Sequence, residues 1–206
     1  MKRSDDFIMK SFIVSYNNII KIVLICFWFL IGSTGCAYLS YVKDPFVDIP
    51  NFHQVDESLY RGGRPNEDGL RKLKDIGIQT VISLCGEDED LDIEKKSISK
   101  LGIDFANIPL SVYKEPTEQQ VLKFLNIVID KHRQPVFVHC DSGRDRTGAM
   151  IAMYRVVVCG WSIKQAYNEA KSLGFWPYRG DAELKRFIHQ LKDKKIYFEA
   201  VGSQIP

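Results

Sequence analysis

Cys140 and Arg146 are separated by five residues and enclose a short polar segment that follows an apolar run at residues 136–139. A free thiol has a pKa of about 8.5, and the nucleophilic species is the thiolate. A helix N-terminus, backbone amides and a nearby cation can lower such a pKa to roughly 3.5–7.5. A planar guanidinium also matches the oxygens of a phosphoryl group. The two residue types at this spacing therefore predict nucleophilic attack by Cys140 on a phosphate ester that Arg146 holds.

The elements around this pair predict an anion-binding loop. Residues 136–139 are expected to form a buried strand, residues 140–146 a tight loop, and an apolar helix is expected to begin at Thr147. Free backbone N–H groups and the positive end of the helix dipole converge at such a junction. The predicted substrate-binding residues are those of the loop and the helix start: Asp141, Ser142, Gly143, Arg144 and Thr147.

The segment HCDSGRDRTG, which starts at His139, resembles the signature of the cysteine-dependent tyrosine and dual-specificity phosphatases. It is most similar to a bacterial and atypical dual-specificity branch, and residues 59–65, 80–85 and 114–116 (LYRGGRP, TVISLC and KEP) extend the likeness over residues 51–193. The resemblance implies that Cys140 forms a phosphocysteine and that Arg146 stabilises the transferring group. It also implies that no metal or cofactor takes part. Thr147 places a hydroxyl near the sulfur, where it can help release the thiol, and His139 is interpreted as orienting the loop by hydrogen bonds, with a catalytic base as the alternative role.

The residue that protonates the leaving oxygen remains open. The resemblance to the branch ending in DRTG implies Asp145 as the general acid. Glu115, with Glu118 nearby, lies about 25 residues upstream of the loop, where the wider superfamily carries its acid, usually an aspartate. The alternative role for Asp145 is structural, as an acceptor for backbone amides of its own loop.

Three functions are compatible with this loop. The first is a protein tyrosine or dual-specificity phosphatase. The second is a phosphoinositide or inositol phosphate phosphatase, and Arg144 and a membrane anchor favour this second function. Asp141 places a negative charge beside the nucleophile, which disfavours a very anionic substrate. The third, an inactive phosphate-binding module, is disfavoured by the intact Cys140, Arg146 and Thr147. A formal net charge of +2 gives no indication of nucleic-acid binding.

Two further groups have open interpretations. Cys85 ends a predicted strand and either forms a reversible disulfide with Cys140 or is a small buried apolar residue. Arg61 and Arg64 either bring positive charge to the site or form ion pairs and solvated surface.

The first 36 residues are expected to form an export leader. Basic residues precede an apolar run at 22–31, and Gly32 to Cys36 resembles a bacterial lipoprotein cleavage box, although Ser33 departs from that pattern. This predicts a bacterial cell-envelope protein anchored to the membrane through lipid on Cys36. A plain export signal and an ordinary apolar helix are the alternatives. Residues 37–51 are predicted as a linker, 52–195 as the phosphatase domain and 196–206 as a tail.

The remaining chain predicts an α/β fold, because apolar strand-like runs alternate with amphipathic stretches of helical period. We expect a mostly parallel central sheet with helices on both faces, as in dual-specificity phosphatases. The expected strands are residues 52–55, 58–61, 79–84, 103–108 and 136–139, and the expected helices are 67–76, 93–101, 118–132, 147–158, 163–173 and 181–192.

Overall fold

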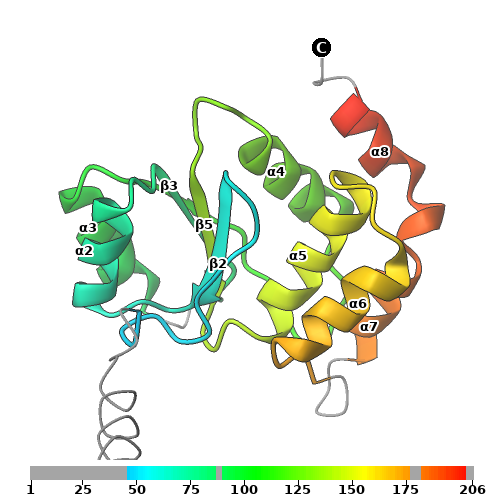
Figure 1. The fold of residues 1–206 in the computed structure, drawn as a ribbon, viewed down its shortest axis with the longest axis horizontal. Coiled ribbons are helices and arrows are strands. Elements are labelled where there is room, and N and C mark those ends of the chain that lie inside the picture. The colour runs from blue at the N-terminus through cyan, green and yellow to red at the C-terminus, as the bar shows by residue number, and fades with distance from the viewer. Residues whose placement is uncertain (1–45, 87–89, 177–181, 203–206) are drawn as a thin grey trace, which may run out of the picture. The chain divides into compact units, whose positions relative to one another are not determined.

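A five-stranded sheet forms the centre of the computed structural model, which describes residues 46–86, 90–176 and 182–202 (Figure 1). The strand order is β1-β2-β5-β3-β4. Only β1 is antiparallel to its neighbour, and the other pairs are parallel, so the predicted mostly parallel α/β sheet is confirmed. The strands are β1 (His53–Gln54), β2 (Leu59–Gly63), β3 (Thr80–Ser83), β4 (Asp104–Asn107) and β5 (Val136–Cys140).

Helices cover both faces of this sheet, also as predicted. Figure 1 shows α2 and α3 on one side and α4 to α8 on the other, with α5 between the sheet and the outer helices. The helices are α2 (Glu67–Asp75), α3 (Leu91–Lys100), α4 (Glu118–Val128), α5 (Asp145–Val157), α6 (Ile163–Ser172), α7 (Ala182–His189) and α8 (Lys195–Gly202), with a 3-10 turn at Leu191–Asp193.

Side chains alternate between the two faces along β5, as they must in a strand. Val136, Val138 and Cys140 belong to the larger hydrophobic core beneath α4 to α8. Phe137 belongs to the smaller core beneath α2 and α3, and the ring of His139 stacks on it with centroids 5.7 Å apart. The nucleophile candidate and its neighbouring histidine therefore leave the strand on opposite faces.

Local capping explains where two helices on the larger face begin. The Thr117 side chain accepts a hydrogen bond from the Gln120 amide, and the Gln120 side chain accepts one from the Thr117 amide. Ser162 and Gln165 form the same reciprocal capping box at the start of α6. Each capping box fixes the direction in which its helix leaves the preceding loop.

Several boundaries differ from the predicted ones. Helix α5 starts at Asp145 rather than at Thr147, so Asp145 and Arg146 lie in its first turn. Helix α4 ends at Val128 rather than at His132, because residues 131–133 turn toward β5. The expected helix 181–192 is interrupted after His189 by the 3-10 turn.

Packed residues are also described on both sides of the predicted domain limits, residues 52–195. Within the expected linker, Ile49 is buried in the smaller core. The expected tail contains α8, whose Tyr197 and Val201 are buried. The expected leader and Cys36 lie outside the described residues. Among the residues that are described, no helix has the length and apolar character needed to cross a bilayer.

Candidate active site

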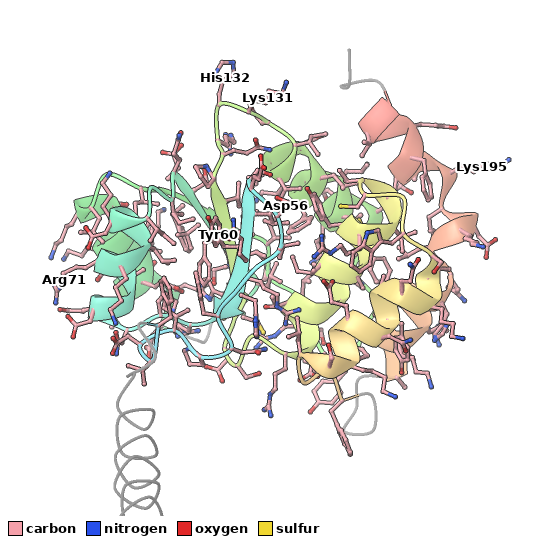
Figure 2. All side chains as sticks on the ribbon, in the orientation of Figure 1. Asp56, Tyr60, Arg71, Lys131, His132 and Lys195 are labelled. Atoms are coloured by element: carbon pink, nitrogen blue, oxygen red, sulfur yellow. The ribbon has the colours of Figure 1, made fainter. Side chains whose placement is uncertain are left out.

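The candidate site lies at the carboxyl edge of the parallel strands. Cys140 is the last residue of β5 and pairs with Gly63 of β2, while His139 pairs with Ser83 of β3 on the other side. Loops that leave this edge of an α/β sheet form its usual ligand site. Figure 2 shows Lys131 and His132 before β5, at the opposite edge, so neither contributes to the site.

Gly63 of β2 and Gly143 of the loop after Cys140 allow this loop to lie directly against β2. Gly143 has a φ of +71°, and a Cβ atom there would overlap the backbone of Gly62 and Gly63. A Cβ on Gly63 would approach the Asp141 carbonyl oxygen to 2.8 Å. The Arg64 amide donates to that same carbonyl at 3.0 Å. Gly63 is therefore required by backbone packing against the signature loop.

The Gly143 carbonyl is held by two side chains from distant segments. Arg61 donates to it through Nη2, and Asn51 donates to it through Nδ2 at 2.9 Å. Asn51 also binds the Leu173 carbonyl at 2.9 Å, so it connects the loop to the end of α6. Asn51 was assigned to the linker, and its role could not be found from sequence because its partners are about a hundred residues away.

Arg61 is the most deeply buried cation at this edge, with 1% of its surface exposed. Burial lowers the pKa of Arg61 to about 10, while the nearby charges of Cys140 and Glu169 act to raise it. The guanidinium thus stays charged at neutral pH. Of the two interpretations offered for Arg61, positive charge near the site fits this placement, whereas a solvated surface position does not.

Arg146 extends from the first turn of α5 toward the neighbouring strand. Its Nη1 donates to the carbonyl oxygen of Leu84, directly after β3, at 3.3 Å. The Leu84 amide in turn donates to the His139 carbonyl at 2.8 Å. Cys140 and Arg146 are therefore at the same edge of the sheet. Thr147 is fully buried beside them, and its Oγ1 has no hydrogen-bond partner among the described residues.

His139 is oriented from α3, on the face opposite to Cys140. Its Nε2 lies 2.8 Å from Oε1 of Glu94, and its Nδ1 lies 3.3 Å from the Cys140 carbonyl oxygen. Oε2 of Glu94 accepts a hydrogen bond from Ser83 at 3.4 Å. This arrangement suits an orienting role for His139. Glu94 was missed, although its spacing of four from the buried Ile98 placed it on the inner face of α3.

The two candidate acids have different partners. Oδ1 of Asp145 accepts a hydrogen bond from the Trp176 amide at 2.9 Å, so its structural partner lies in a different loop from the one expected. Oε1 of Glu115 accepts one from Nε of Arg186, on α7, at 2.7 Å. Asp145 lies in the first turn of α5 beside Arg146, whereas Glu115 belongs to an ion pair with another helix.

The outer part of the loop is exposed. Asp141 and Arg144 are exposed and Ser142 is half-buried. The aliphatic part of Arg144 packs over Gly174, where a Cβ atom would lie 2.9 Å from Arg144 Cδ. The loop thus presents one acidic and one basic side chain to solvent.

Among the described residues, Cys85 and Cys140 are buried and Cys159 is exposed, and these three cysteines form no disulfide with one another. Cys85 follows Leu84 at the end of β3, and its carbonyl accepts a hydrogen bond from Asn107 at 3.0 Å. The redox pairing of Cys85 with Cys140 stays a prediction. Within the described ranges, no group of three or more His, Cys, Asp or Glu side chains is placed to hold a metal ion.

Comparisons with known proteins agree with this geometry. A family model described as DSP-PTPase phosphatase fused to NAD+ kinase matches residues 45–182. The dual specificity protein phosphatase TpbA of Pseudomonas aeruginosa is 29% identical over 126 residues, which cover 61% of this chain and 55% of TpbA. The inositol diphosphatase DSP5 of Arabidopsis thaliana is 27% identical over 130 residues, covering 60% of this chain and 63% of DSP5. Each match therefore spans less than two thirds of the relative's own length.

Solved structures share the fold. The crystal structure of TpbA has a TM-score of 0.63 at 24% identity and covers 77% of this chain and 94% of TpbA. The core catalytic domain of the PP-IP phosphatase SIW14 from S. cerevisiae, solved with citrate, has a TM-score of 0.64 at 22% identity. The match covers 76% of this chain and 94% of the SIW14 domain. These likenesses confirm the predicted dual-specificity phosphatase fold.

Proposed function

The chain belongs to the DSP-PTPase phosphatase family, whose model matches residues 45–182, and from this premise we propose that it hydrolyses phosphate monoesters through a phosphocysteine. The observation that carries the proposal is that Cys140 and Arg146 lie at the same edge of the sheet. Arg146 is held there by its hydrogen bond to the Leu84 carbonyl oxygen, directly after β3. Nothing in the proposed reaction requires a metal or an organic cofactor.

In the first step the Cys140 thiolate attacks phosphorus, the bond between phosphorus and the ester oxygen breaks, and the leaving oxygen takes a proton. In the second step water attacks the phosphocysteine, which releases inorganic phosphate and restores the thiolate. The transferring group carries its charge on three equatorial oxygens in a loose transition state, and the guanidinium of Arg146 and the loop amides stabilise that charge.

Asp145 is the preferred general acid. It lies next to Arg146 in the first turn of α5, and the hydrogen bond from the Trp176 amide fixes its orientation through one oxygen. Glu115 is the second candidate, but it would have to loosen its ion pair with Arg186 in order to carry a proton. His139 is not proposed as a base, because its ring packs on the face of β5 opposite to Cys140.

The central test is Cys140→Ser, assayed on p-nitrophenyl phosphate with and without EDTA. Hydrolysis is expected to fall by about 10⁴-fold or more, since the nucleophile is lost. Binding of inorganic phosphate should persist. Cys159→Ser is the matched control, because Cys159 is exposed and lies after the end of α5, and it should hydrolyse at the wild-type rate. Hydrolysis that survives Cys140→Ser, or that requires a divalent cation, would exclude the cysteine mechanism.

For the substrate we propose a phosphorylated protein, with tyrosine or dual specificity, and an inositol phosphate or phosphoinositide as the second candidate. The similarity to TpbA supports the first class and the similarity to DSP5 supports the second. Asp141 favours the phosphoprotein, because it adds negative charge to the exposed part of the loop. A panel of phosphotyrosine and phosphoserine peptides, phosphoinositides and an inositol pyrophosphate, compared by kcat/KM, separates the two classes.

We also propose that the chain is exported in a bacterium and anchored through lipid on Cys36. The support is the apolar run at 22–31 followed by small residues up to Cys36. Growth with radiolabelled palmitate should label the wild-type chain and not Cys36→Ala. Equal labelling of the two would contradict the anchor.

A further inference from the structure

Arg61 packs beneath the signature loop, and the reaction described above does not yet use it. We propose that Arg61 is a positioning residue that serves as the counter-ion of the Cys140 thiolate and fixes the Gly143 carbonyl against β2. This inference rests on the proposed function, since it assigns a role to Arg61 within the same site.

The side chains of Arg61 and Cys140 leave the sheet on the same face. Arg61 pairs with Val138 in the parallel register of β2 and β5, and Cys140 lies two residues after Val138. Paired residues on adjacent strands share a face, and so do residues two apart along one strand. Both side chains therefore enter the layer between the sheet and α5, close to the turn at Gly143.

Among the residues that the structure describes, no carboxylate is a partner of this guanidinium. No described Asp or Glu lies within ion-pair distance of Arg61, and its Nε and Nη1 have no hydrogen-bond partner among the described residues. Glu169 of α6 acts on Arg61 electrostatically. That carboxylate is already held by Arg155, whose Nη2 lies 2.7 Å from Oε1 and whose Nε lies 3.1 Å from Oε2.

A buried cation without an anion is unfavourable, so a compensating negative charge is required. Cys140 is the group that can supply it: it is 2% exposed, lies on the same face, and its charge favours the protonated guanidinium. The attraction is mutual, because a cation beside a thiol stabilises the thiolate.

Asn51 provides a matched comparison. Both Arg61 and Asn51 donate to the Gly143 carbonyl oxygen, but only Arg61 is charged. If Arg61 acts only by holding the loop, loss of either donor should have similar consequences. If it acts as a counter-ion, only its own loss should change the ionisation of Cys140.

The experiment measures thiolate content in the full chain by absorbance at 240 nm between pH 5 and 8. Each protein is read against the same protein with Cys140→Ser added, so that only Cys140 contributes. For Arg61→Met we expect the ratio of thiolate to thiol at pH 6.5 to fall at least about tenfold, the effect of one nearby opposite charge. Asn51→Ala should keep the wild-type ratio within about threefold, as a neutral donor has no such effect.

Steady-state kinetics on p-nitrophenyl phosphate give the second readout. In Arg61→Met, kcat at pH 6.5 should fall in step with the thiolate content and recover as the pH is raised. In Asn51→Ala any loss of kcat should be the same across this pH range. Arg61→Lys keeps a positive charge but loses the guanidinium fork, so this variant should retain the Cys140 thiolate. It serves as the test if circular dichroism shows that Arg61→Met does not fold.

The outcomes separate this inference from the proposed function. A folded Arg61→Met with wild-type thiolate content, or a folded Arg61→Lys without thiolate, overturns the counter-ion role while Cys140 catalysis stands. A wild-type protein that forms the thiolate but hydrolyses no phosphate ester overturns the proposed function alone. Absence of a Cys140 thiolate in the wild type at pH 6.5 removes the counter-ion role directly.

Discussion

The base and the rim of the candidate site differ in how tightly their polar side chains are held. The base consists of residues that are at most 7% exposed, namely Arg61, Glu94, His139, Cys140 and Thr147. We call the rim the exposed or half-buried side chains of the loops that carry the remaining candidate residues and their partners, namely Asp141, Arg144, Glu115 and Trp176. Base residues come from β2, α3, β5 and α5, whereas every rim residue comes from a loop.

This difference predicts a division of labour. In the base, water is excluded and charges interact strongly, so a change of one group should alter the rate of the chemical step. At the rim, charges are solvated and screened, so a change should alter substrate preference more than rate. The following substitutions test this division, beginning with the largest expected effect.

Replacement of Arg146, which belongs to neither the base nor the rim as defined above, should give the largest loss of kcat after replacement of Cys140 itself. Arg146→Lys keeps a positive charge but loses the two-pronged geometry, and we expect kcat to fall by about 10³-fold with a small change in KM. Arg71→Lys is the matched control, because Arg71 points outward from α2 in Figure 2 and its ion pairs with Glu67 and Asp68 lie on the surface. A loss of less than about tenfold in Arg146→Lys would mean that another group holds the phosphoryl oxygens.

The general acid should give the next largest effect, and it should depend on the leaving group. If Asp145 is the acid, Asp145→Asn should lower kcat on phenyl phosphate about 10²-fold and have much less effect on p-nitrophenyl phosphate, whose leaving group needs little protonation. Glu115→Gln is the paired variant and should show no such selectivity. The reverse pattern would assign the acid to Glu115 and leave Asp145 with its structural contact to Trp176.

Loss of Glu94 tests whether the base is held from α3. Glu94→Ala leaves Nε2 of His139 and Oγ of Ser83 without their buried partner, so we expect a loss of about 1–3 kcal/mol in the free energy of unfolding. For a domain of this size each kcal/mol lowers Tm by about 2–4 °C. Asp92→Ala, an exposed position in the same helix, should change Tm by about a degree or less. Equal Tm values for Glu94→Ala and Asp92→Ala would show that the His139–Glu94 contact contributes nothing to stability.

Much of this site could be predicted from local sequence. The strand, loop and helix around Cys140 are contiguous, so their hydrophobic pattern and spacing define the geometry within one segment. The start of α5 was misplaced by two residues because Asp145 and Arg146 are polar and resemble loop residues, whereas they occupy the first turn of the helix.

The supports of the site could not be predicted in the same way. Asn51 acts on Gly143 from 92 residues away, and nothing in the local pattern distinguishes it from a linker residue. Arg61 occupies an inward position of a short strand, where an apolar residue is the usual choice. Such contacts depend on strand order and register, which a single sequence does not contain.

The smallest effects are expected at the rim, and they should differ between substrates. Arg144→Ala should change kcat on p-nitrophenyl phosphate by less than about threefold, since Arg144 is exposed and its charge is screened. On an inositol pyrophosphate the same change should raise KM by about three- to tenfold, because several substrate charges lose one cation. Asp141→Asn should act in the opposite direction and lower KM for the same compound. Both variants are compared with wild type at 50 and 300 mM salt, where the KM differences should shrink as screening increases. A large change in kcat from either variant would show that the rim takes part in the chemical step, and the division between base and rim would then be wrong.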